Sequence, residues 1–198
     1  VCSSDLNVHV IFQGVAASDQ ALGLWGVTGY DMFIYDRLTD TVTSFAPQGS
    51  YLGFDQPQPV NDGALVRYYP HFNQAEAWYW HHETNALTPL LQPGDSVSVA
   101  DVQSDGKTLA WVHGGLPLTP DYFYPWAELW ASPFASNKAD LAPKKVRSLP
   151  TQGGVAAHLN GDRYAIYSYL EKLVYVIRLS DGWQWTFHPP DESYDFYE

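Results

Sequence analysis

Two short groups hold the side chains best suited to chemistry, and neither has the spacing that chemistry requires. His81-His82-Glu83 offers metal ligands without the H-E-x-x-H pattern of zinc enzymes. On a strand, His81 and Glu83 would share one face and His82 the other, so the two imidazoles would not reach one ion. The segment 94–98, Gly-Asp-Ser-Val-Ser, begins like a nucleophile elbow but lacks its second glycine. We therefore predict no catalytic residue, no metal site and no cofactor in this chain.

An acidic segment, 191–195, supplies carboxylates that suit a hard cation such as calcium. It lacks the glycine and the regular Asp spacing of a calcium loop, and we interpret it as an exposed connector. Over the whole chain, 22 acidic residues against 10 basic ones give a formal charge of −12. Such a surface repels the phosphates of nucleic acids and anionic membrane surfaces, so we expect neither as a partner. No stretch approaches the roughly 20 apolar residues of a membrane span.

Aromatic side chains in two long connections, 14–29 and 114–127, are the best candidates for a binding site. Tyr and Trp give a large contact area at a low entropic cost, which suits recognition of a protein, a peptide or a carbohydrate. The alternative is that these rings pack against the adjoining part of the fold. Five side chains are the candidate binding residues: Trp25, Tyr122, Phe123, Tyr124 and Trp126.

A repeated turn indicates the framework that carries these connections. The segments 61–69, 104–112 and 160–167 each combine Asn or Asp with Gly and then run into an apolar stretch. Asn, Asp and Gly tolerate the positive φ that a tight hairpin needs at its centre. Apolar and polar residues alternate over 97–102, directly before the second of these turns, which predicts a strand there.

A second hairpin follows each repeated turn or stands in the same phase. The segments 33–45, 78–91 and 173–187 each read as a strand, a short polar turn and another strand. The stretches 128–131 and 145–149 fill the same two positions with a longer connection. Each unit thus holds four strands, A to D, in roughly 40–55 residues, which is the size of a propeller blade.

We predict an all-β chain that forms a partial β-propeller of about four antiparallel four-stranded blades. The 16% of aromatic residues suits strands, and 15 Gly and 14 Pro supply the turns. A sandwich of short strands is the alternative, but it would not require the turns to recur in phase. The predicted blades span 7–190 and are 7–46, which lacks strand A, 47–93, 94–151 and 152–190, with 191–198 as the start of a further blade or a tail.

One of these units resembles a known family. The segment 104–112, Ser-Asp-Gly-Lys-Thr-Leu-Ala-Trp-Val, is similar to the S/P-D-G-K-x-[IL]-A-[FW] signature of TolB-type and WD40-like propeller repeats. Tyr35-Asp36, with Thr39 and the strand that follows, resembles a hairpin of the same blades. The other units depart from the signature: 160–162 reorders the turn, and no Trp-Asp dipeptide closes a blade. The resemblance implies a scaffold for protein contacts or the gating domain of a prolyl-oligopeptidase-like enzyme.

The first six residues need separate treatment. Residues 1–6, Val-Cys-Ser-Ser-Asp-Leu, read as the in-frame translation of a sequencing adapter, an artefact of an assembled metagenomic fragment. Setting them aside removes the only cysteine, Cys2, and with it any disulfide. We then expect flanking blades of the same chain to be missing and to be its natural partners. The acidic charge and the many Trp and Tyr residues suit an exported bacterial protein, so we expect a periplasmic or secreted location.

In propeller blades the B–C and D–A connections emerge on one face, and both long aromatic connections are of the B–C kind. We predict a non-catalytic propeller module that binds a protein, peptide or carbohydrate through this B–C face. The alternative is the gating propeller of an exported prolyl-oligopeptidase-like peptidase or other hydrolase. In that case the catalytic domain would lie outside these 198 residues.

Overall fold

The structure is a computed structural model, and it describes part of the backbone and a smaller part of the side chains. The described backbone covers residues 9–15, 30–36, 41–45, 54–71, 74–81, 83–92, 94, 97–115, 126–149, 155–168 and 171–188. Side chains are described within these ranges from Gln58 onward, apart from residues 59, 71 and 155–157.

The first two sheets are antiparallel meanders whose strands pair in chain order. Sheet 1 has three strands: β1 (His9–Val15), β2 (Tyr30–Asp36) and β3 (Thr41–Phe45). Sheet 2 has four: β4 (Phe54–Val60), β5 (Gly63–His71), β6 (Gln74–His81) and β7 (Ala86–Leu91).

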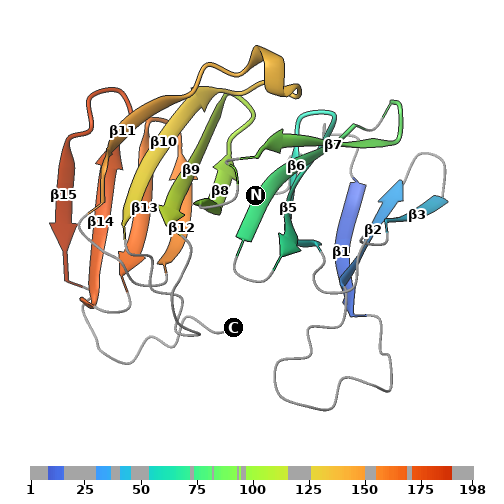
Figure 1. Ribbon diagram of the computed structural model, residues 1–198, viewed down its shortest axis with the longest axis horizontal. Coiled ribbons are helices and arrows are strands. Elements are labelled where there is room, and N and C mark those ends of the chain that lie inside the picture. Colours follow the sequence, from blue (N-terminus) through green and yellow to red (C-terminus); the bar gives the residue numbers. More distant parts are fainter. Residues whose placement is uncertain are drawn as a thin grey trace.

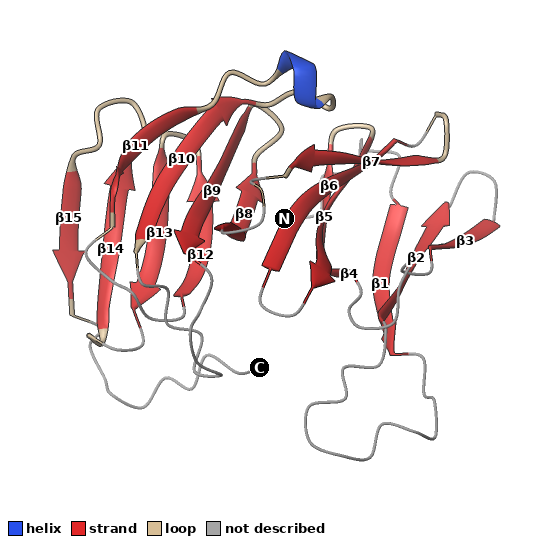
Figure 2. Ribbon diagram, viewed as in Figure 1, coloured by secondary structure: helices blue, strands red, loops and turns tan. Residues whose placement is uncertain are grey.

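Sheets 3 and 4 repeat the four-stranded meander. Sheet 3 contains β8 (Val97–Ser104), β9 (Thr108–Gly115), β10 (Ala127–Pro133) and β11 (Lys144–Ser148). Sheet 4 contains β12 (Val155–Asn160), β13 (Arg163–Ser168), β14 (Leu173–Arg178) and β15 (Gln184–Phe187). The described part of the chain is thus all-β, as predicted, except for one short 3-10 helix, Lys138–Asp140, between β10 and β11 (Figure 2).

The repeated turns have the backbone geometry that their residue types predict. Asn61 at φ 51°, Gly106 at φ 84° and Gly161 at φ 56° lie between the first and second strands of sheets 2, 3 and 4. Gly63 is required for another reason: a Cβ there would lie 2.0 Å from the carbonyl oxygen of Trp80 on the paired strand. The sequence pattern therefore identifies the hairpins because each needs a residue that accepts a left-handed backbone or a close approach.

The four sheets follow one another in chain order along the long axis of the molecule (Figure 1). Neighbouring sheets approach through their first strands: β4 contacts β1 and β2, β8 contacts β4 and β6, and β12 contacts β8. We call the face of a sheet that points toward the next sheet its forward face, and the opposite face its rear face. This arrangement of successive sheets, rather than two stacked layers, is what the repeat predicted.

Two apolar clusters fill the spaces between sheets 2 and 3 and between sheets 3 and 4. The first joins the forward face of sheet 2, with Leu65 and Tyr79, to the rear face of sheet 3, with Leu109 and Trp111. The second joins the forward face of sheet 3 to the rear face of sheet 4, and its fully buried members are Ala110, Val112, Leu129, Tyr164, Ile166 and Ile177. A third, smaller cluster buries Ala64, Val66 and Trp80 on the rear face of sheet 2.

The first strand of sheet 3 differs from the regular alternating strand that its sequence predicts. A bulge interrupts its pairing with β9 between Ala100 and Gln103, and Asp101 within the bulge has a φ of 48°. Both Ser98 and Asp101 are buried, since β8 lies between two neighbouring sheets. The bulge matters for packing because the Asp101 carbonyl oxygen accepts a hydrogen bond from Tyr164 Oη of sheet 4.

Polar side chains also tie neighbouring sheets together. Gln58 of β4 donates to the Ser104 carbonyl oxygen at 2.9 Å and accepts from the Ser104 N–H at 3.1 Å. Ser98 Oγ of β8 accepts a hydrogen bond from the buried Ala75 N–H of β6 at 3.0 Å. Such bonds satisfy backbone N–H and C=O groups that do not pair within a sheet and lie where two sheets meet. No helix in the described ranges is long and apolar enough to cross a membrane.

Candidate functional site

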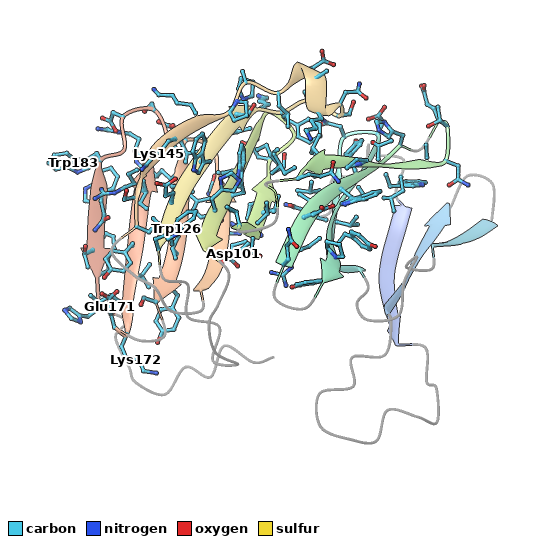
Figure 3. All side chains as sticks on the ribbon, in the orientation of Figure 1. Asp101, Trp126, Lys145, Glu171, Lys172 and Trp183 are labelled. Atoms are coloured by element: carbon cyan, nitrogen blue, oxygen red, sulfur yellow. The ribbon has the colours of Figure 1, made fainter. Side chains whose placement is uncertain are left out.

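Of the five predicted binding residues, the structure describes one. Trp126 lies directly before β10, at the end of the B–C connection of sheet 3, and its side chain is 42% exposed (Figure 3). Its carbonyl oxygen accepts from the Gly115 N–H at 3.1 Å, which fixes the end of the connection to the last residue of β9. Four of the predicted residues lie outside the described residues: Trp25, Tyr122, Phe123 and Tyr124.

A polar and aromatic group lies beside Trp126 on the rear face of sheet 3, and the sequence analysis did not select it. Glu128 of β10 accepts from Trp130 Nε1 at 3.1 Å and forms an ion pair with Lys145 Nζ at 2.5 Å. His113 pairs with Glu128 across the β9–β10 ladder, and its ring centre lies 5.3 Å from that of Trp130. We call His113, Glu128, Trp130 and Lys145 the rear-face cluster.

Sheet 2 repeats this arrangement at the matching place. Glu76 of β6 accepts from Trp78 Nε1 at 2.7 Å, and the Tyr68 ring packs edge-on against Trp78 at 5.1 Å. Gln92 supplies a further donor to Glu76 at 3.2 Å. In both sheets the fourth strand has a bulge opposite this motif, between Ala77 and Trp78 and between Leu129 and Trp130.

A sequence signal for both clusters was present and unused. Ala75-Glu76-Ala77-Trp78 and Ala127-Glu128-Leu129-Trp130 share the pattern A-E-x-W at the start of a third strand. Residues two apart on a strand point to the same face, so the Glu carboxylate reaches the Trp indole N–H. The pattern predicts a Glu–Trp hydrogen bond at the B–C end of a blade.

The ionisation of the rear-face cluster follows from its contacts. The hydrogen bond from Lys145 lowers the pKa of Glu128, so this carboxylate stays charged at neutral pH. Burial lowers the pKa of His113, and the negative charge of Glu128 only partly opposes that shift. His113 is therefore a neutral imidazole that can donate through one ring nitrogen and accept through the other. Among the described residues, none accepts a hydrogen bond from the buried Nε1 of the neighbouring Trp111.

The other residues that the sequence singled out hold structural positions where they are described. His81 Nε2 lies 2.9 Å from Thr88 Oγ1, and its ring packs edge-on against Tyr79. Glu83 is exposed, whereas His82 lies outside the described residues. Within the described ranges, no three His, Cys, Asp or Glu side chains lie close enough together to hold a metal ion. What the rear-face cluster and Trp126 offer is a surface with one exposed ring, one carboxylate and one ammonium group.

Comparisons with known proteins test the fold. No protein-family model matches the chain, and no curated protein matches it by sequence. A solved prolyl endopeptidase is similar with a TM-score of 0.55 and 14% identity over 84% of this chain and 24% of that one. The acylaminoacyl peptidase of Pyrococcus horikoshii matches with a TM-score of 0.51 and 10% identity over 81% of this chain and 28% of that one. TolB of Acinetobacter baumannii matches 82% of this chain and 38% of its own with 11% identity and a TM-score of 0.48.

The chain thus spans less than two fifths of the length of these structures. At these identities the similarity concerns the fold and no more. The sequence prediction of an all-β partial propeller is confirmed by the successive antiparallel sheets together with the propeller-like matches. The chain has the architecture of a β-propeller portion, similar to the propellers of prolyl endopeptidase and acylaminoacyl peptidase.

Proposed function

We propose that this chain is a non-catalytic propeller module that binds a peptide segment of a partner protein through its B–C face. The observation that carries the proposal is Trp126, a large ring that is 42% exposed at the end of the long B–C connection of sheet 3. Exposed Trp and Tyr side chains beside polar groups are typical of binding hot spots. Two charged residues supply such groups: Glu128 of β10, two residues after Trp126, and its ion-pair partner Lys145 of β11.

Charge favours a basic partner over an acidic one. The chain carries a formal charge of −12, so it attracts a Lys- or Arg-rich peptide over distances of about a Debye length. An exposed indole also attracts a Lys or Arg side chain through a cation–π contact. A carbohydrate would use the ring face of Trp126 without this charge preference, and the test below separates the two.

The experiment uses Trp126→Ala and, as a matched control, Trp183→Ala. Trp183 is 59% exposed but lies by β15, away from the B–C connection of sheet 3 (Figure 3). Binding of three short synthetic peptides, one basic, one neutral and one acidic, and of an arrayed glycan set is measured for the three proteins. We expect the basic peptide to bind and Trp126→Ala to weaken it about tenfold, with Trp183→Ala unchanged. Equal losses in both variants, or binding of glycans alone, would contradict the proposal.

A second candidate function is the propeller domain of a peptidase. The observation that favours it is that two of the similar structures, at TM-scores of 0.55 and 0.51, are peptidases several times longer than this chain. In this case the catalytic groups would be supplied by another domain, and the propeller would restrict which peptides reach them. Sequencing the gene on both sides of this segment tests it. An adjoining α/β region with a Ser, His and Asp set supports the peptidase, and its absence supports the binding module.

A further inference from the structure

The last strand of sheet 3 differs in charge from the last strands of the other three sheets. β3, β7 and β15 contain no charged residue, whereas β11 contains Lys144, Lys145 and Arg147 within five residues. The chain as a whole has 10 basic residues and a formal charge of −12, so β11 reverses the sign of the overall charge. In the described part of the chain β11 pairs with β10 alone, and no described strand pairs with its outer edge.

The connection that leads into β11 adds a fourth basic residue. Lys138 lies exposed in the short 3-10 helix between β10 and β11 (Figure 2). The connection is held in place because the Ala142 N–H donates to Oγ of the buried Ser132 at 3.0 Å. In the segment 138–147 the single acidic residue is Asp140. The connection and β11 together therefore form a fixed surface of positive charge.

Ion pairing separates the lysines of this surface into two kinds. Lys145 forms an ion pair with Glu128 at 2.5 Å, so its charge is largely neutralised within sheet 3. Lys138 and Lys144 are exposed, and among the described residues no carboxylate lies within ion-pair distance of either ammonium group. These two lysines are therefore available to a negatively charged partner.

Arg147 also keeps its charge, although it is hydrogen-bonded. Its guanidinium donates from Nη1 to the Gly182 carbonyl oxygen at 3.0 Å and from Nε to the Ser148 carbonyl oxygen at 3.3 Å. Carbonyl oxygens carry only a partial charge, so these bonds orient the guanidinium without neutralising it. We call Lys138, Lys144 and Arg147 the basic edge.

We infer that the basic edge binds an acidic, extended peptide segment of a partner protein. Lysines on an outer strand also keep two copies of a protein from pairing edge to edge. The uncharged β3, β7 and β15 do without such lysines, so that role does not explain why β11 alone carries them. At physiological salt the Debye length is about 8 Å, so a carboxylate at this surface interacts mainly with the cations beside it and little with the distant acidic residues.

The small size of the basic edge favours a peptide over a nucleic acid. A nucleic acid carries a phosphate at every nucleotide and would extend from these three cations over a chain of formal charge −12. A peptide can place two or three carboxylates opposite the cations and leave its other residues uncharged. Opposite charges placed in this way give specificity and speed association.

The inference is independent of the binding role proposed for Trp126. Lys138 follows β10 and Lys144 pairs with Ala131 near its last residue, whereas Trp126 directly precedes the strand. The chain would thus bind basic and acidic segments at opposite ends of β10. Trp126→Ala should leave binding of an acidic peptide unchanged, so failure of either proposal does not decide the other.

The test titrates the full chain with a short synthetic peptide in which Glu alternates with Ser, and with its Gln counterpart. We expect the Glu peptide to bind, and to bind at least about tenfold more weakly when NaCl is raised from about 50 to about 300 mM. Lys144→Glu should weaken binding about tenfold. Lys172→Glu is the matched control, because Lys172 is an equally exposed lysine in the turn between β13 and β14, away from the basic edge (Figure 3).

Two further variants separate charge from shape and from folding. Lys144→Arg keeps the charge and should bind the Glu peptide within about twofold of the unchanged chain, whereas Lys138→Glu repeats the charge reversal outside the strand and should also weaken binding. Equal binding of the Gln peptide overturns the inference, as does an equal loss in Lys172→Glu. An oligonucleotide of the same charge that binds as tightly as the Glu peptide overturns it too, and so does a Glu peptide that does not bind at low salt.

Discussion

The forward faces of sheets 3 and 4 both carry small apolar side chains in their second and third strands, but these side chains differ in burial. In the second and third strands, sheet 3 places Ala110, Val112 and Leu129 there, and sheet 4 places Ala165 and Val176. The side chains of the first set are buried and those of the second are partly exposed. An apolar face in this fold therefore indicates a sheet that can pack against a neighbour. The apolar side chains stabilise the fold only where a neighbouring sheet removes them from water.

The largest expected effect comes from placing a charge on the forward face of each sheet. Val112→Asp buries a carboxylate without a cation between sheets 3 and 4, and should cost about 4 kcal/mol or more of unfolding free energy. Val176→Asp leaves the carboxylate in contact with water and should cost about 1 kcal/mol or less. Urea unfolding in dilute solution measures the difference. Equal losses would mean that the two faces are equally covered.

A second test adds volume where the first adds charge. Ala110 and Ala165 are both the third residue of a second strand, counted from the repeated turn in sheets 3 and 4. Ala110 is 0% exposed, so Ala110→Leu must displace side chains of sheet 4 and should cost about 1–3 kcal/mol. No sheet in the described part of the chain covers Ala165, which is only partly buried, so Ala165→Leu should change stability by about 0.5 kcal/mol or less. If Ala165→Leu is the more damaging change, the forward face of sheet 4 is packed at least as tightly as that of sheet 3.

A third test concerns the polar bond at the closed boundary of sheet 4. Tyr164→Phe removes the donor to the Asp101 carbonyl oxygen and leaves a buried acceptor, at a cost of about 1–2 kcal/mol. Tyr175→Phe is the control: its hydroxyl bonds Glu171 within sheet 4 at 2.6 Å, and its loss should cost less. Thermal unfolding of the two variants ranks them. The reverse order would show that the bond between sheets adds little to their association.

The sequence predicted the hairpins well because their turns depend on local chemistry. Asn61, Gly106 and Gly161 take the positive φ that their residue types allow, and no distant contact is needed to produce it. The bulge at Asp101 could not be predicted in this way, since it depends on where Tyr164 of the next sheet places its hydroxyl. Likewise, the forward face of sheet 4 is less buried than that of sheet 3, and alternation within one strand does not encode whether a neighbouring sheet covers a face.

The candidate site was predicted in part. The aromatic content of the B–C connection led to Trp126, which the structure places at the surface. The same reasoning did not select Glu128 and His113, because it considered patterns within one segment, whereas these two residues pair across neighbouring strands. The A-E-x-W pattern would have revealed Glu128, but the approach of Lys145 depends on the bulge in β11.

The smallest expected effect is a change in pH dependence at the boundary between sheets 2 and 3. Burial lowers the pKa of His113 from 6.5, against a smaller opposing effect of Glu128. As pH falls below 6.5, the unfolded chain takes up a proton before the folded chain does. The stability present above that pH is therefore lost as the pH falls through the lowered pKa of the folded state. No buried His lies among the described residues on the forward face of sheet 4, so this loss belongs to a covered face of sheet 3.

His113→Tyr isolates the effect, because Tyr68 holds the matching position against Trp78 in sheet 2. We expect the wild-type chain to lose more unfolding free energy than the variant between about pH 7 and pH 5, as measured by urea unfolding at each pH. Glu128 stays ionised over this window because Lys145 lowers its pKa, so it does not contribute to the difference. Parallel pH profiles would place water around His113, and the rear face of sheet 3 would then be no more closed than the forward face of sheet 4.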